Sequence, residues 1–177
     1  MDTKDRIALY EKLYFFELER KEKLISRLSL PLAIIVTLSS LLSTMLEKAP
    51  PYSDGMYGVL FWIFYLCCMI TAVRSAWYFW RTWQLRDYDA LLPDLSALED
   101  HRQDLQRHFE THGESQDDAQ AHFREIIIRF YVDCTTVNTR NNDKRAAYFS
   151  NMATNVALTF FLAMLSFGTL HLYQRGH

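Results

Sequence analysis

Neutral polar side chains recur within a long apolar stretch near the end of the chain, where they could hold water and ions. The stretch begins at Phe149 and is uncharged for long enough to cross a bilayer, which takes about 20 helical residues. When several copies of one helix surround an axis, such side chains form stacked rings that replace part of an ion's hydration shell. The sequence therefore predicts pore-lining residues at Asn151, Asn155, Thr159 and Ser166. The alternative is that these residues hydrogen-bond between packed helices.

A polar junction comes directly before this stretch. It contains Asn138, Asn141, Asn142, Lys144 and Arg145. Asparagine side chains hydrogen-bond to nearby backbone and favour breaks or caps in helices, while Lys144 and Arg145 would hold the helix end at the lipid headgroups. In a ring of subunits the two cations would surround the cytoplasmic mouth of a pore. They would raise the local anion concentration there, which predicts a preference for anions.

The chain offers few groups for catalysis or for binding a metal. His108 and His112 have the i,i+4 spacing that can hold a metal on one helix face, but no HExxH frame accompanies them. The three cysteines form no CxxC pair, and GxGxxG, GxSxG and Walker lysine motifs are missing. A net charge of −2 lacks the basic excess of a nucleic-acid-binding domain. We expect neither an enzyme nor a bound metal or cofactor.

Two more apolar segments precede the third and predict a pair of spans within residues 28–83. The first runs over Leu28–Leu46 and the second over Met56–Val73, joined by the turn-forming segment Glu47–Gly55. Basic residues gather before the first span and at the end of the second, whereas the connection carries one lysine. By the positive-inside rule the N-terminus is cytoplasmic, and the connection and the tail Gln174–His177 lie outside.

The first span carries small and hydroxyl-bearing residues about every four positions, which places them on one helix face. These residues are Ser29, Ala33, Thr37, Ser40 and Thr44. Small residues are enriched where membrane helices pack closely, so helix packing is one interpretation. The other is a polar wall that faces water.

The remaining parts of the chain predict cytosolic helices. Residues 1–27 alternate charged and apolar side chains at helical spacing, which predicts an amphipathic helix rather than a signal peptide. This helix would lie on the membrane surface or, as we prefer, pack against other helices of the assembly. Residues 84–147 predict two antiparallel helices opened by capping boxes at Ser96–Glu99 and Ser115–Asp118. Their apolar line would assemble subunits or receive a signal, and consists of Phe123, Ile126, Ile127 and Phe130.

The sequence thus predicts an all-α membrane protein with three transmembrane helices, an N-terminal amphipathic helix and a cytosolic helical hairpin. Its third membrane helix and short tail would occupy residues 148–177. This layout, together with the junction at Asn138, Asn141, Asn142, Lys144 and Arg145, resembles the SLATT-like bacterial membrane effectors that accompany nucleotidyltransferases in anti-phage defence. The third span departs from the plain two-span description of that family.

The resemblance implies an oligomeric pore in the bacterial inner membrane that depolarises the infected cell. Its partners would be membrane lipid, further copies of the chain, and an operon-encoded nucleotidyltransferase or the nucleotide or oligonucleotide signal it makes. The competing hypothesis is a membrane-anchored interaction module that recruits a cytosolic partner without conducting ions. Repeated asparagines inside the bilayer favour the pore, because a simple anchor has no need of amides that cost free energy when unpartnered.

Overall fold

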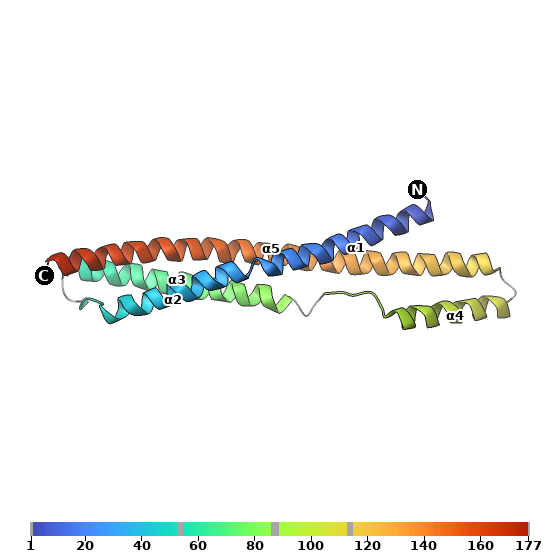
Figure 1. Ribbon diagram of the computed structural model, residues 1–177, viewed down its shortest axis with the longest axis horizontal. Helices are drawn as coiled ribbons and strands as arrows, with labels where there is room; N and C mark the ends of the chain where they lie inside the picture. The colour runs from blue at the N-terminus through green and yellow to red at the C-terminus, as the bar shows by residue number, and fades with distance from the viewer. Residues whose placement is uncertain (1, 53–54, 86–88, 113–114, 177) are drawn as a thin grey trace. The chain divides into compact units, whose positions relative to one another are not determined.

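The computed structural model describes residues 2–52, 55–85, 89–112 and 115–176, and these residues form helices without strands. The helices are α1 (Thr3–Ser26), α2 (Ser29–Glu47), α3 (Gly55–Gln84), α4 (Leu95–Thr111) and α5 (Gln116–Gly176) (Figure 1). Three helical stretches are long and apolar enough to cross a membrane: Thr3–Glu47, Gly55–Gln84 and Gln116–Arg175. The all-helical fold and the three span-forming helices were both expected from the sequence.

The chain divides into two compact units. One, here called the charged unit, comprises Met1–Glu22 and Asp87–Asp143. The other, here called the apolar unit, comprises Lys23–Arg86 and Lys144–His177. The predicted boundary between residues 147 and 148 does not end a helix, because α5 continues without interruption over 61 residues. The usual preference of asparagine for caps and breaks predicted an interruption at the junction. The asparagines of the junction instead lie within the continuous helix α5.

The apolar unit is a bundle of α2, α3 and the second half of α5, with α3 antiparallel to both neighbours. The Tyr65 hydroxyl donates to the Leu42 carbonyl at 3.3 Å, which joins α3 to α2. The Thr159 hydroxyl of α5 donates to the Thr71 hydroxyl of α3 at 2.9 Å. In this unit the end of α5 lies beside the end of α2 and the start of α3 (Figure 1). Two apolar clusters fill the bundle, one around Phe61 and one around Met152.

Proline and glycine residues set the ends of α2 and α3. Pro31 occupies the first turn of α2, where a missing backbone N–H removes no helical hydrogen bond. Gly55 opens α3 with a φ of 76°, a conformation that side chains disfavour. A Cβ at Gly58 would lie 2.8 Å from the Pro51 carbonyl oxygen, so this close approach requires glycine. Of the predicted connection Glu47–Gly55, residues 53 and 54 lie outside the described residues.

In the charged unit, α1 runs parallel to the first half of α5, and the start of α5 is capped as predicted. The Ser115 hydroxyl accepts from the Asp118 backbone N–H at 3.2 Å, which satisfies one of the free donors of the first turn. The other predicted capping box was wrong. Helix α4 already begins at Leu95, and the Glu99 carboxylate binds Arg102 and Gln103 instead of the backbone. The hydrogen bond from Arg102 lowers the pKa of Glu99 to about 2.

Candidate functional site

The asparagines of the predicted junction lie inside the charged unit rather than at a solvated surface. Asn138 is 2% exposed, and its carboxamide pairs with the backbone of Ala90. The side-chain Nδ2 donates to the Ala90 carbonyl, and the Ala90 N–H donates to Oδ1, both at 2.9 Å. A carboxamide has the same donor and acceptor pair as a peptide bond. Asn138 thus supplies the hydrogen bonds that the non-helical backbone around Ala90 cannot make with itself.

The same non-helical segment is held at further points by α1 and α5. The Leu92 N–H donates to the Tyr14 hydroxyl at 3.4 Å, and the Lys21 ammonium lies 2.9 Å from the Asp89 carboxylate, whose side chain is 4% exposed. Cys134 contacts the Leu91 carbonyl through its thiol. Burial raises the pKa of the Cys134 thiol, so it stays protonated at neutral pH. These contacts fix the connection that leads into α4.

Asn142 joins α5 to α1. Its fully buried Nδ2 donates to the Glu17 carbonyl oxygen at 2.8 Å and to the Glu17 carboxylate at 2.9 Å. Next to this pair, the Arg20 guanidinium donates to the Asp143 carboxylate at 2.7 Å. The Asp143 hydrogen bond raises the pKa of Arg20 above its usual value. Asn141 is also buried, so all three asparagines belong to the packed interior, and Glu17 is a partner that sequence spacing did not identify.

Arg145, in the apolar unit, is buried. Its side chain is 0% exposed, and a terminal guanidinium nitrogen donates to the Leu85 carbonyl just after the end of α3. The last carbonyls of a helix have no partner within the helix and carry partial negative charge, so a cation is favourable there. Arg145 therefore caps α3. Of the two cations predicted for the mouth, only Lys144 is exposed.

The predicted pore line on α5 divides between two environments. Thr159 is 1% exposed and Ser166 is fully buried within the apolar unit, whereas Asn151 is exposed and Asn155 is half-buried. The reason is the helical phase. At about 100° per residue, Thr159 and Ser166 lie within roughly 40° of the buried Met152, but Asn151 lies about 100° away.

Their hydrogen bonds follow the same division. Thr159 binds Thr71 of α3, and the Asn155 amide donates to the Asn151 carbonyl of its own helix at 2.7 Å. Thr159 and Ser166 face the interior of the apolar unit, so they do not form an outward polar face with the two asparagines.

The outward polar face belongs to α2 instead. Six hydroxyl side chains of this helix are exposed, at Ser29, Thr37, Ser39, Ser40, Ser43 and Thr44. They lie between about 100° and 180° around the helix from Leu38, which packs in the bundle core. The sequence showed four of them as part of a small-residue row, and Ser39 and Ser43 extend that row. We call these six residues the α2 hydroxyl face.

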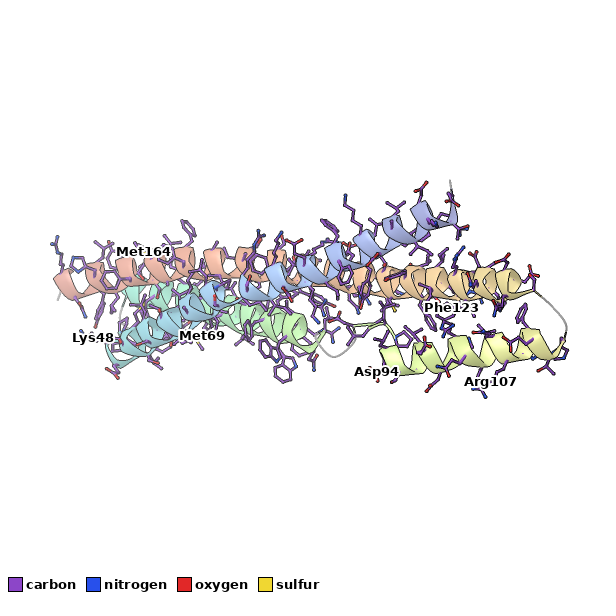
Figure 2. All side chains as sticks on the ribbon, turned by 45° about the vertical axis from the view of Figure 1, so that its right-hand side comes forward. Lys48, Met69, Asp94, Arg107, Phe123 and Met164 are labelled. Atoms are coloured by element: carbon purple, nitrogen blue, oxygen red, sulfur yellow. The ribbon has the colours of Figure 1, made fainter. Side chains whose placement is uncertain are left out.

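The hydroxyls of this face are only partly satisfied by their own helix. Thr37, Ser39 and Thr44 donate to carbonyls four residues earlier, at distances of 2.8 to 3.1 Å. Each oxygen keeps acceptor capacity that lipid tails cannot use. The outward faces of the other two helices are apolar in comparison. Exposed residues at similar depth are Ile63, Leu66, Met69, Ile70 and Val73 on α3, and Leu158, Phe160, Phe161, Met164 and Leu165 on α5. Met164 points away from the other two helices (Figure 2).

The apolar line predicted for assembly lies partly against its own chain. Phe123, Ile126, Ile127 and Phe130 are all half-buried in the charged unit, and the neighbouring Ile128 is buried. Phe123 lines a cavity of about 290 Å³ between α5 and α4, together with Arg102 and Gln106. It lies on the α4 side of α5, whereas Arg107 lies on the outer side of α4 (Figure 2). Helix α4 therefore covers part of the surface that we expected a partner to cover.

Helix α1 exposes large apolar side chains in the charged unit. Its inner face carries Tyr14, whose ring packs edge-on against Tyr131 of α5 at a centroid distance of 5.8 Å. Away from this contact the helix exposes Leu9, Leu13, Phe15 and Phe16, with Phe16 at 57%. The first two and Phe16 lie within about 60° around the helix, and Phe15 lies about 100° from Phe16. We call these four residues the α1 apolar face. Exposed apolar clusters of this kind mark interaction surfaces.

The histidines of α4 do not belong to a metal cluster. The rings of His108 and His112 lie 4.3 Å apart, and Nδ1 of His112 is 2.8 Å from the His108 carbonyl oxygen. Across the described residues, no group of three or more His, Cys, Asp and Glu side chains gathers as metal ligands would. No family model, no curated protein and no solved structure matches this sequence.

Proposed function

We propose that the chain is a subunit of a homo-oligomeric membrane pore in which the α2 hydroxyl face lines the conducting path. The observation that carries this proposal is the position of that face. Its six hydroxyls point away from their own bundle, on a side of α2 that also exposes Leu32 and Val36. Against lipid, the acceptor oxygens of six hydroxyls would stay unsatisfied. Around a symmetry axis, the same face would form rings of neutral oxygens that hold water.

The proposed pore is lined by α2, whereas the sequence predicted pore-lining residues on α5. Thr159 makes an interhelical hydrogen bond to Thr71, an interaction worth about 0.6 kcal/mol on average in membranes, and Ser166 is fully buried. Their burial removes half of the line that the sequence suggested. The α2 hydroxyl face supplies a comparable number of oxygens from one exposed side of one helix.

Conductance of the purified chain in a planar bilayer tests this assignment. We expect the wild-type protein to conduct and a Thr37→Leu/Ser40→Leu/Thr44→Leu variant to lose most of its conductance, because apolar rings favour dewetting. Thr154→Leu is the matched control. Thr154 is also exposed and also donates to the carbonyl four residues earlier, but it lies on α5. Unchanged conductance in the triple variant, with the oligomer intact, would remove the pore from α2.

The role in anti-phage defence rests on the resemblance to SLATT-like effectors. In that role the charged unit would receive a partner or nucleotide signal, and pore opening would stop growth of the host cell. Induced expression of the chain with and without its neighbouring genes tests this role. Growth arrest that requires a conducting α2 supports it, and normal growth under every condition contradicts it.

The α1 apolar face favours a second candidate, an interaction module anchored in the membrane. Such a module would use Leu9, Leu13, Phe15 and Phe16 to recruit a cytosolic partner, and it would carry no current. The conductance measurement separates the two functions, because an anchor gives no current in the wild type and no difference between the two leucine variants.

A further inference from the structure

An open apolar groove runs between α2 and α5 in the apolar unit. Its volume is about 810 Å³, within the range of small-molecule sites. Leu30 and Ile34 of α2 form one wall, and Phe149 and Phe160 of α5 bound the other. Leu30 and Phe160 are more than half exposed, so the groove opens sideways, toward the surface that would meet lipid.

Small side chains create this groove. Ala153 and Ala157 lie one turn apart on α5 and line it between the two phenylalanines. From Phe149 to Phe160 the helix rises about 16 Å. The hydrocarbon of one leaflet is about half of a core of roughly 30 Å. The groove is therefore as long as one leaflet is deep, which suits a single acyl chain lying along the helices.

A cation stands at one end of the groove. Arg27 lines it at the turn between α1 and α2, next to the hydroxyl-bearing Ser26 and Ser29. Both serine hydroxyls donate to carbonyls of the preceding turn. Within the described residues, no hydrogen bond or ion pair is found for the exposed Arg27 guanidinium. A guanidinium matches the geometry and charge of a phosphate, and basic pockets between membrane helices bind anionic headgroups.

We propose that this groove binds an anionic phospholipid, with one acyl chain between α2 and α5 and the phosphate at Arg27. The apolar walls fit the chain, and the charge at one end sets its direction and selects the headgroup. The inference rests on the membrane insertion that the proposed function requires, but it does not depend on conductance. A lipid held here would contact Ser29, the first residue of the α2 hydroxyl face, and would lie beside the other five.

Native mass spectrometry of the delipidated full-length protein tests the site with phosphatidylglycerol and phosphatidylcholine of identical acyl chains. We expect the wild type to prefer phosphatidylglycerol by about fivefold, the effect of one basic residue near a headgroup. Arg27→Gln should abolish that preference, whereas Arg74→Gln, an exposed arginine of α3 outside the groove, should keep it. Ala157→Trp should lower the affinity for both lipids by about tenfold or more, because the indole would displace part of the acyl chain from the groove. Losing the burial of two methylenes of that chain already lowers the affinity about tenfold.

Leu158→Trp is the control for Ala157→Trp, because Leu158 is exposed on α5 and does not line the groove. Circular dichroism checks that both tryptophan variants fold, and Ala153→Leu replaces Ala157→Trp if that variant does not. Wild-type lipid affinity in the filled-groove variant, or equal losses in Leu158→Trp, overturns the site. Phosphatidylglycerol preference in Arg27→Gln, or competition by inorganic phosphate alone, overturns the lipid headgroup as the ligand.

Alkaline extraction of cell membranes separates failure of this site from failure of the proposed function. A chain that stays in the membrane fraction but shows no groove-dependent lipid binding contradicts the lipid site alone. A chain that is washed out of the membranes contradicts membrane insertion, and with it both proposals.

Discussion

At the scale of single residues, the asparagines of α5 act as substitutes for missing backbone partners. Asn138 pairs with both polar groups of Ala90, and Asn142 holds the backbone and carboxylate of Glu17. Buried polar groups without partners are costly, so these carboxamides stabilise the packing of a non-helical segment and of α1 on α5. Arg145 has a similar role at the end of α3.

Replacing Asn142 with leucine should destabilise the chain by about 2 kcal/mol, since it leaves a buried carbonyl and a buried carboxylate short of a donor. Denaturant unfolding of the detergent-solubilised full-length protein, followed by circular dichroism, measures the change. Asn151→Leu is the matched control, because Asn151 is exposed on the same helix, and its unfolding free energy should barely change. Equal losses of unfolding free energy in the two variants would show that the hydrogen bonds of Asn142 to Glu17 do not stabilise the fold.

At the scale of helices, one face of α1 is packed and the other is exposed. The inner face packs on α5 through Tyr14 and Glu17, and the outer face exposes four large apolar side chains. On α5, Ile128 is 4% exposed. A charged residue introduced at the exposed side of α1 should therefore affect assembly of the protein, and one introduced at the buried Ile128 of α5 should affect its folding.

Phe16→Glu should reduce the oligomeric state of the full-length protein without lowering its melting temperature, because the Phe16 side chain is 57% exposed. Ile128→Asp should instead destabilise the fold by about 3 kcal/mol or more, since it buries an unpaired carboxylate. Light scattering after gel filtration reports the oligomer, and thermal unfolding reports the fold. An oligomer that survives Phe16→Glu would exclude the α1 apolar face as a contact between subunits.

At the scale of the whole molecule, the order of the apolar helices sets the topology. In the apolar unit, α3 is antiparallel to α2 and to α5, so the three successive apolar helices alternate in direction (Figure 1). The connection after α2 and the end of α5 then emerge at the same end of this bundle (Figure 1). By the positive-inside rule, we expect the basic residues before α2 to direct that end to the outside of the cell.

Single cysteines at Lys48 and Gln174 should accordingly react with a membrane-impermeant maleimide added to intact cells. Both positions are exposed, one just after α2 and one near the end of α5. A cysteine at Asp104 of α4 should react only after the cells are opened. Labelling of the Gln174 position only in opened cells would eliminate the third crossing. Gln174 is used because His177 of the predicted outer tail lies outside the described residues.

The sequence by itself determined the features that depend on neighbours in the chain. Long apolar runs predicted three helices able to cross a membrane, because hydrocarbon contact requires an apolar surface over the full thickness. The cap at Ser115 was also predictable, since its partner is three residues away.

The tertiary structure alone decided which side of each helix is inside. The polar residue types of 138 to 145 predicted a junction at the headgroups, yet four of these eight residues are buried, and Asn138, Asn142 and Arg145 pack against Ala90, Glu17 and Leu85. The polar row on α5 and the hydroxyl row on α2 have similar spacing, so periodicity could not distinguish them. Packing of α5 against α3 turned Thr159 inward, and packing of α2 through Leu38 and Leu42 turned its hydroxyls outward. Those contacts join residues that are far apart in the chain, and a helical period contains no information about them.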